Sequence, residues 1–335
     1  MKPVIYGLSG LALTDDERAL YRDADPCGYI LFKRNVADRA QLRALTDSLR
    51  ELSGRDDVPI LIDQEGGKVQ RMGPPEWPDF PAGPAFDALY EIAPVSAIEA
   101  VRAHAHATAL MLNEVGINTD CWPLLDVNQP DTTEAISIRA LGSEPMRVAA
   151  MGRAILEGLR SGGVVGVVKH MPGHGRAKVD THHHLPTVTA SDAELEVDIE
   201  PFRTLADAPM GMTSHIVFEA WDQERPATLS PIVVEQVIRG KIGFDGLLMT
   251  DDIDMKALSG TAGEKAAGAI AAGCDLVLDC WGRMDEMAEI ATLLGDMPAK
   301  SVERLDRAMA TVKGVTPEAD FDELIAKRDS LLALV

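Results

Sequence analysis

Five of the chain's eight histidines lie in one stretch, KHMPGHGRAKVDTHHHLP, which spans residues 169–186. Lys169 and His170 end an apolar run, and the proline and glycines that follow cannot continue as a helix. Asp180 and His182 lie two residues apart in an irregular segment. There a carboxylate can turn to hydrogen-bond an imidazole, which fixes its tautomer and prepares it for proton transfer. The stretch could therefore bind metal, move protons or hold a polar ligand.

A metal site is the weaker of these interpretations. His170, His174 and the run 182–184 lack the compact ligand spacing of zinc sites, and His183 and His184 can simply be solvated. A second pair, His104 and His106, lies two residues apart in a helical pattern, so its side chains point to different faces. We expect that pair to be structural or at the surface, and we expect neither a metal nor a cofactor.

Carboxylates also follow the apolar run in MTDDIDM, residues 249–255. Asp251, Asp252 and Asp254 come directly after a predicted buried strand. One such aspartate taken alone is as often the N-cap of a helix as a catalytic group. Asp252 and Asp254 also match the weak DxD pattern of metal-dependent glycosyltransferases.

A third candidate segment is DQEGGKVQR, residues 63–71. Its glycine pair suggests a phosphate loop, but the GK[ST] ending and the GxGxxG spacing of such loops are missing. The alternatives are a loop that approaches a ligand closely between Asp63 and Arg71, or a turn with solvated charges.

The elements that position these residues alternate between short apolar runs and helical patterns. Continuous apolar strands indicate a parallel sheet buried on both faces, and the alternation indicates βαβ units. Seven or eight such units fit a single (β/α)8 barrel of the TIM type better than a doubly wound sheet. The predicted strands lie within 28–35, 58–67, 118–127, 164–175, 210–218, 246–255 and 274–280, and the helices near 38–53, 95–115, 146–161, 192–206, 230–240, 262–272 and 283–294. We expect 298–334 to add helices on the outside.

In such a barrel the polar residues at the carboxyl ends of the strands converge on one mouth, where barrel active sites lie. This expectation brings residues far apart in the sequence into one candidate site. The predicted mouth residues are Lys33, Arg34, Asp63, Asp126, Lys169, His170, His215, Asp251 and Asp279.

The composition limits the classes of partner. The 335 residues, 46% of them hydrophobic, can bury a large core, and we expect one catalytic domain over 1–335. The net charge of −21 disfavours nucleic acid and anionic membranes as partners. No signal peptide and no apolar run of about 18 residues is found. Four cysteines without CxxC spacing favour reduced, buried thiols and a cytoplasmic location; they are Cys27, Cys121, Cys274 and Cys280.

Six ordered segments resemble those of family 3 glycoside hydrolases, in the branch of bacterial β-N-acetylglucosaminidases that recycle peptidoglycan. The resemblance covers about residues 25 to 295. It implies a (β/α)8 barrel with β-N-acetylhexosaminidase activity, and it departs from other branches because we expect no second α/β sandwich domain. The segments are IDQEGGKVQRM, WPLLDVN, SIRALGSEP, KHMPGHGRAKVDTHHHLP, TSHIVF and FDGLLMTDDIDMKAL.

The resemblance also implies roles for individual residues. Asp251 is the implied nucleophile, and Asp180 with His182 is the implied acid/base dyad. The chemistry is consistent, because retaining hydrolysis needs an attacking carboxylate and a proton donor, and an imidazole exchanges protons near neutral pH. The implied sugar-binding residues are Asp63, Arg71, Arg139, Lys169 and His170.

The expected substrate is a small carbohydrate, an N-acetylglucosamine-containing muropeptide or disaccharide. The alternatives are a β-N-acetylglucosaminide phosphorylase or another exo-β-glycosidase on the same dyad, a metal-dependent amidohydrolase, and a sugar-binding barrel without activity. The sequence leaves open the aglycone preference and the oligomeric state. It is compatible with a monomer.

Overall fold

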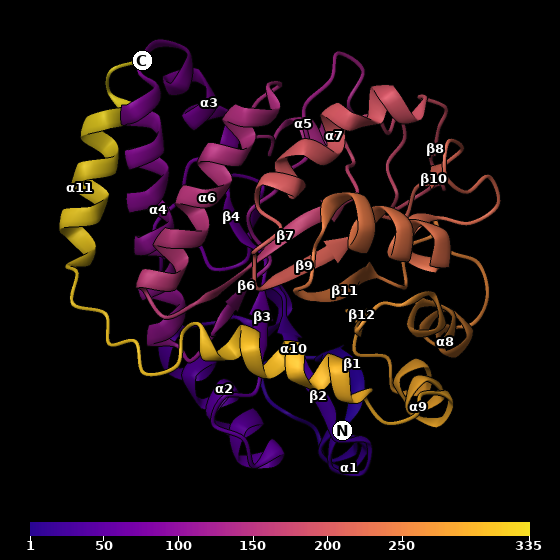
Figure 1. Ribbon diagram of the computed structural model, residues 1–335. Coiled ribbons are helices and arrows are strands. Elements are labelled where there is room, and N and C mark those ends of the chain that lie inside the picture. Colours follow the sequence, from indigo (N-terminus) through magenta and orange to yellow (C-terminus); the bar gives the residue numbers. More distant parts are fainter.

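The computed structural model describes all 335 residues, and its centre is a closed barrel of eight parallel strands (Figure 1). The strands neighbour one another in the order β1-β12-β11-β9-β7-β6-β3-β2. The predicted (β/α)8 barrel is therefore confirmed. The strands are β1 (Lys2–Gly7), β2 (Pro26–Leu31), β3 (Ile60–Ile62), β6 (Thr119–Asp120), β7 (Val165–Met171), β9 (Met210–Thr213), β11 (Leu247–Asp252) and β12 (Leu276–Asp279).

The apolar runs predicted seven of these strands, and the eighth is β1 at the N-terminus. It lies between β2 and β12 and closes the ring, with Val4 opposite Val277 and Ile5 opposite Gly28. Its apolar stretch is only VIYG, and it follows the first two residues after Met1. A run this short gave no signal of its own.

Helices surround the barrel and include all of the predicted ones. Thr14, Asp38, Ser191 and Thr261 begin α1, α2, α7 and α8, because each side chain accepts a hydrogen bond from the backbone N–H three residues on. The helices are α1 (Asp15–Ala24), α2 (Arg39–Ser53), α3 (Gly83–Ile92), α4 (Pro94–Glu114), α5 (Glu134–Ser137), α6 (Pro145–Ser161), α7 (Asp192–Thr204), η3 (Val233–Ile242), α8 (Ala262–Ala272), α9 (Met284–Leu293), α10 (Ala299–Ala310) and α11 (Phe321–Leu332). No helix has the length and apolar character needed to span a membrane.

The core has two layers, because successive strand residues face opposite sides of the sheet. Ile5, Leu61 and Leu247 belong to a cluster inside the barrel, while Val4 and Tyr6 belong to the larger cluster between strands and helices. The four cysteines are free and buried, as expected. The additional C-terminal helices are also present, and α11 lies along α4 (Figure 1).

Helix α10 closes the end of the barrel where the strands begin. Its residues Leu305 and Ala308 join the interior cluster. The buried carboxylate of Asp275, next to the start of β12, binds this helix to the barrel. It accepts hydrogen bonds from Ser301 at 2.6 Å and Arg304 at 3.0 Å. It also accepts one from Arg239 at 2.7 Å and one from the backbone N–H of Leu248 at 2.9 Å.

Substitution of Asp275 is therefore expected to destabilise the fold strongly. In Asp275→Ala the buried guanidinium of Arg304 loses its buried partner, and a broken buried pair costs about 3–5 kcal/mol. The exposed Asp245, which also pairs with Arg304 and with Arg307, is the matched control. Asp245→Ala should cost under about 1 kcal/mol, as for other surface pairs. Urea unfolding measures both variants, and equal losses would contradict this account of Asp275.

Candidate active site

The loop after β3 turns back as a short hairpin over the mouth of the barrel. Its strands are β4 (Gln64–Gly66) and β5 (Val69–Gln70). Gly66 has a φ of +96°, and a Cβ there would lie 2.3 Å from the carbonyl oxygen of Pro81. The glycine pair therefore serves a tight hairpin rather than a phosphate loop. The hairpin carries Asp63, Glu65 and Arg71 to the same edge of the mouth.

Lys169, at the end of β7, reaches the carboxylates of this hairpin. Its Nζ lies 3.2 Å from Asp63 Oδ1 and 2.7 Å from Glu65 Oε1, and the side chain is 2% exposed. Arg71 donates to Asp63 Oδ2 at 2.8 Å. Arg139 approaches Glu65 with two nitrogens, at 2.6 and 2.9 Å. The structure thus joins four of the predicted sugar-binding residues into one cluster, through Glu65.

Glu65 itself was not among the predicted site residues. Burial alone would raise its pKa, but Arg139 and Lys169 outweigh that effect and lower the pKa to about 2. The pKa of Asp63 is likewise held below its usual range, because Lys169 and Arg71 outweigh its burial. The charges of the predicted residues could have pointed to Glu65. Three cations, Arg71, Arg139 and Lys169, were predicted with a single carboxylate, Asp63, so a second carboxylate was to be expected nearby.

His170, the fifth predicted sugar-binding residue, is held by Asp126. The Asp126 carboxylate contacts His170 Nδ1 at 2.8 Å and accepts hydrogen bonds from the backbone N–H groups of His170 and His174, at 3.2 and 2.7 Å. Burial would raise the pKa of Asp126, but His170 outweighs it and the pKa is lowered. Because an ionised carboxylate only accepts, Nδ1 of His170 carries the proton. Its Nε2 then faces Asp251, 3.9 Å from Oδ2.

Asp251 is the last residue but one of β11, and its side chain is partly exposed at the mouth. Its Oδ1 accepts a hydrogen bond of 2.8 Å from the backbone N–H of Asp252. Burial would raise the pKa of Asp251, but His170 and His215 outweigh it and keep the pKa below its usual range. The carboxylate is therefore ionised and available to react. His215 is fixed beside it by Thr228 at 2.7 Å and by the carbonyl oxygen of Asp252 at 2.9 Å.

Asp180 and His182 lie apart from this cluster, on the long loop after β7. Asp180 Oδ1 contacts His182 Nδ1 at 2.8 Å and accepts from the His182 backbone N–H at 2.9 Å. The His182 side chain is 66% exposed. Neither residue hydrogen-bonds to the mouth cluster. The structure therefore forms the pair but does not bring it to Asp251.

The remaining candidate histidines and aspartates have other surroundings. His104 is buried against Phe80, Phe86 and Trp122, in accord with the expected structural role. The Asp254 carboxylate pairs with Arg283 at 2.7 Å, and the Asp254 backbone N–H donates to Asp252 Oδ1 at 3.1 Å. The structure contains no group of three or more His, Cys, Asp or Glu side chains that could bind a metal ion.

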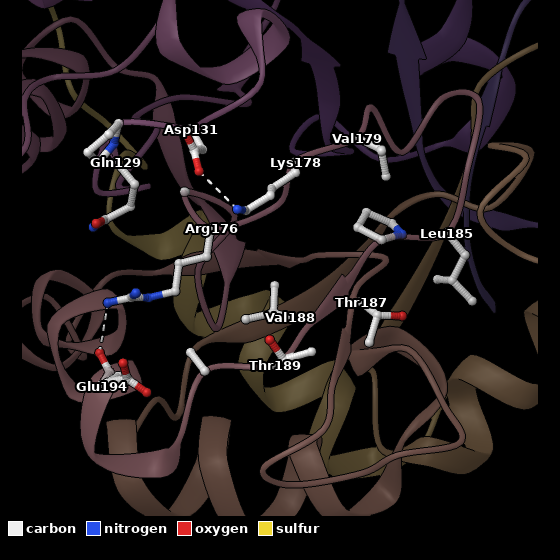
Figure 2. A pocket seen from close by; sticks show the side chains of 14 residues that line it. Gln129, Asp131, Arg176, Lys178, Val179, Leu185, Thr187, Val188, Thr189 and Glu194 are labelled. Carbon is white, nitrogen blue, oxygen red and sulfur yellow. Dashed lines mark hydrogen bonds and ion pairs between the residues drawn. The ribbon is translucent and has the colours of Figure 1, made fainter.

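A cavity of about 630 Å³ lies beside the histidine loop, between the loop residues 129–131 and the start of α7. Figure 2 shows Arg176 and Lys178 along one part of its wall and Val179 and Leu185 along another. Lys178 pairs with Asp131 at 2.9 Å, and both side chains are exposed. The cavity does not include Asp251 or the sugar-binding cluster.

Comparisons with known proteins agree with the architecture and the motifs. Residues 7–314 match the family described as "Glycosyl hydrolase family 3 N terminal domain". The sequence is 36% identical to a β-hexosaminidase of Chromobacterium violaceum, over 98% of this chain and 91% of that protein. The NagZ structure from Neisseria gonorrhoeae in complex with N-trifluoroacetyl-D-glucosamine has a TM-score of 0.87 and 29% identity, over 99% of this chain and 98% of that one. The structure of a family 3 β-N-acetylglucosaminidase from Paenibacillus sp. str. FPU-7 has a TM-score of 0.81 and 32% identity. The match covers 98% of this chain and 61% of that one.

The buried carboxyl group of Asp279, at the end of β12, should make stability depend on pH. Neither of its oxygens has a hydrogen-bond partner, and burial, with a smaller effect of Asp252, raises its pKa to about 8. An unfolded aspartate has a pKa near ~3.9. Between these values only the folded state keeps the proton, so this group lowers stability as the pH rises from about 4 to 8.

Asp279→Asn removes that proton linkage. Relative to the parent protein, the variant should gain about 4 kcal/mol more in unfolding free energy at pH 9 than at pH 5, because the linkage is worth about 1.4 kcal/mol per pH unit up to the folded-state pKa. Urea unfolding at the two pH values measures the difference. A gain or loss of the same size at both values would contradict the assignment of a protonated Asp279.

Proposed function

The chain belongs to glycosyl hydrolase family 3 and is a glycoside hydrolase, and from this membership we propose a retaining exo-β-N-acetylglucosaminidase. It removes a terminal, non-reducing N-acetylglucosamine through a covalent sugar ester of Asp251. The observation that carries the proposal is the ionised Asp251 beside the buried cluster of Lys169, Asp63, Glu65 and the two arginines. The sugar analogue held by the Neisseria protein supports a 2-acylamino sugar as the ligand.

The cluster supplies the groups that would bind the sugar. Lys169, Arg71 and Arg139 donate hydrogen bonds, and Asp63 accepts them, so neighbouring hydroxyl groups of one sugar ring can be paired in both directions. Each of these side chains is already fixed by an opposite charge at 2.6–3.2 Å. Convergent polar groups of this kind orient a ligand. Because the side chains are already ordered, binding of the sugar costs little side-chain conformational entropy.

The reaction then has two steps. Asp251 attacks the anomeric carbon, the glycosidic bond breaks, and the leaving oxygen takes a proton from His182. In the second step neutral His182 removes a proton from water, which attacks the sugar ester and releases Asp251. Because His182 does not contact Asp251 in the structure, the mechanism requires the loop to bring the dyad over the bound sugar. Asp180 holds the imidazole in one tautomer during both steps.

The proposed substrates are muropeptides or disaccharides derived from peptidoglycan, and the proposed location is the cytoplasm. The support for the substrates is the resemblance of the six segments to the peptidoglycan-recycling branch. The support for the location is indirect and comes from the four buried, free cysteines.

The first test of this function concerns the acetamido group of the substrate. The aryl β-N-acetylglucosaminide should be hydrolysed with a kcat/KM on the order of 10⁴-fold above that of the matching aryl β-glucoside, as for sites that hydrogen-bond a polar substituent. Both substrates are assayed with and without inorganic phosphate. Comparable kcat/KM values would contradict the acetamide preference, and a glycosyl phosphate product would identify a phosphorylase.

A second test separates the roles of Asp251 and His182. Asp251→Ala should lose activity on every substrate, because the attacking group is gone. His182→Ala should lose little in the first step with a dinitrophenyl leaving group, which departs without a proton, and should accumulate the sugar ester. Azide needs no deprotonation, so it should restore turnover of His182→Ala and yield the β-glycosyl azide.

The control for the second test is His184→Ala, which removes an exposed histidine from the same loop. It should leave kcat/KM unchanged for all leaving groups. Mass spectrometry of His182→Ala mixed with the dinitrophenyl substrate locates the sugar. An adduct on Asp252 or Asp254 would show that another carboxylate is the nucleophile, and an α-glycosyl azide would exclude the covalent intermediate.

A further inference from the structure

We propose that Thr181 and His174 form the contact that holds the Asp180–His182 loop to the barrel, and that both are positioning residues for His182. The inference rests on the proposed function, in which His182 transfers the proton. It assigns a role to a buried threonine and a buried histidine that the mechanism does not otherwise use.

The backbone of the loop after β7 is bonded to the rest of the chain at its two ends. At the first end, the hydroxyl of Thr132 donates to the carbonyl oxygen of Gly175 at 2.6 Å. At the second end, β8 (Thr187–Val188) pairs with β10 (Val217–Phe218). The residues between these ends, 178–185, include both members of the dyad and are therefore held by other means.

Packing contributes little to holding 178–185. All of these residues except Thr181 are exposed or partly exposed. The cavity of about 630 Å³ lies along the loop, with Val179 and Leu185 in its wall (Figure 2). Two side-chain interactions join the segment to the rest of the chain, and one of them is the exposed Lys178–Asp131 pair. An exposed pair of this kind contributes about 1 kcal/mol at most.

The second interaction is that of Thr181 with His174. Thr181 is 4% exposed, although it lies between the exposed His182 and the partly exposed Asp180. Its Oγ1 lies 3.4 Å from Nε2 of the buried His174, and Nδ1 of that ring has no partner, so the threonine hydroxyl is the ring's hydrogen-bond partner. A polar residue is thus the one buried anchor of the dyad segment.

His174 in turn is fixed by the part of the site that would bind the sugar. Its backbone N–H donates to Asp126 Oδ1 at 2.7 Å, and its ring lies 5.5 Å from the ring of His170, edge to face. Asp126 also holds His170, whose Nε2 faces Asp251. One carboxylate therefore sets the position of His170 directly and that of the dyad loop through His174 and Thr181.

The hydroxyl of Thr181 is well placed to control catalysis because the residue is adjacent in sequence to both members of the dyad. Because the loop must turn to bring the dyad over the sugar, this buried contact is the point about which it turns. If the hydroxyl contact is lost, Asp180 and His182 keep their own hydrogen bond, but the barrel no longer directs where the turning loop places them. A misplacement of about 1 Å in a proton-transferring group can cost on the order of 10²-fold in rate. The loss should fall on the steps that need His182 and not on binding of the sugar.

Thr181→Val tests this proposal, because valine keeps the shape of threonine and removes the hydroxyl. The variant should lose roughly 10- to 100-fold in kcat/KM on an aryl N-acetylglucosaminide with a poor leaving group. The first step with the dinitrophenyl leaving group should change by less than about 3-fold, and KM should be similar. Thr181→Ser keeps the hydroxyl and should restore kcat/KM to within about 3-fold of the parent protein. Thr189→Val, the same change at an exposed threonine just after β8, is the matched control.

His174→Phe removes the ring nitrogens and provides an independent route to the same loss. The double variant with Thr181→Val should lose no more activity than either single variant, because the two changes remove one contact. Equal losses for good and poor leaving groups, or an unchanged kcat/KM in folded Thr181→Val, would overturn the proposal. His182→Ala, measured alongside, separates the failures: if it lacks leaving-group dependence, the acid/base assignment fails, and the positioning role fails with it.

Discussion

The ammonium group of Lys169 lies almost entirely out of water, where an uncompensated charge is very unfavourable. Asp63 and Glu65 supply the opposite charges, and their presence in turn requires Arg71 and Arg139. Because each charge depends on its neighbours, the cluster tolerates few alternative arrangements. The β4–β5 hairpin, its glycine pair and the loop that carries Arg139 all adopt the conformation that this charge balance needs.

The site is divided into a rigid part and a loosely held part. The rigid part lies at the ends of β3, β7 and β11 and carries the charged cluster, His170 and Asp251. The loosely held part is the loop with Asp180 and His182, whose attachment is mostly polar and exposed. This division suits the proposed two-step hydrolysis, in which the sugar stays in place while the proton donor adapts to a leaving group and then to a water molecule. Asp126 connects the two parts through His170 and His174.

The sequence predicts those features that leave a local pattern of apolar and polar residues, and it does not predict those that depend on contacts between distant segments. Strands buried on both faces show long apolar runs, so seven of the eight were located, and the residues at their ends, such as Asp63, Lys169 and Asp251, were correctly brought to one mouth. The short β1 gave no such signal. Glu65 was missed because partner charges are set by contacts between distant segments. The position of His182 relative to Asp251 could not follow from periodicity, since few contacts fix the loop that carries it.

The strand β1 has a consequence for how this protein is made. Val4 pairs with Val277, so the first strand of the ring to be synthesised can complete its pairing only after the last strand of the ring has been made. Contacts this distant in sequence are slow to form because of the entropy of closing the chain. Until then the growing sheet has two open edges, at β1 and at its most recent strand, and open edges are sites of aggregation. Nascent chains interrupted before residue 276 should therefore be clients of chaperones, however well their early segments have folded.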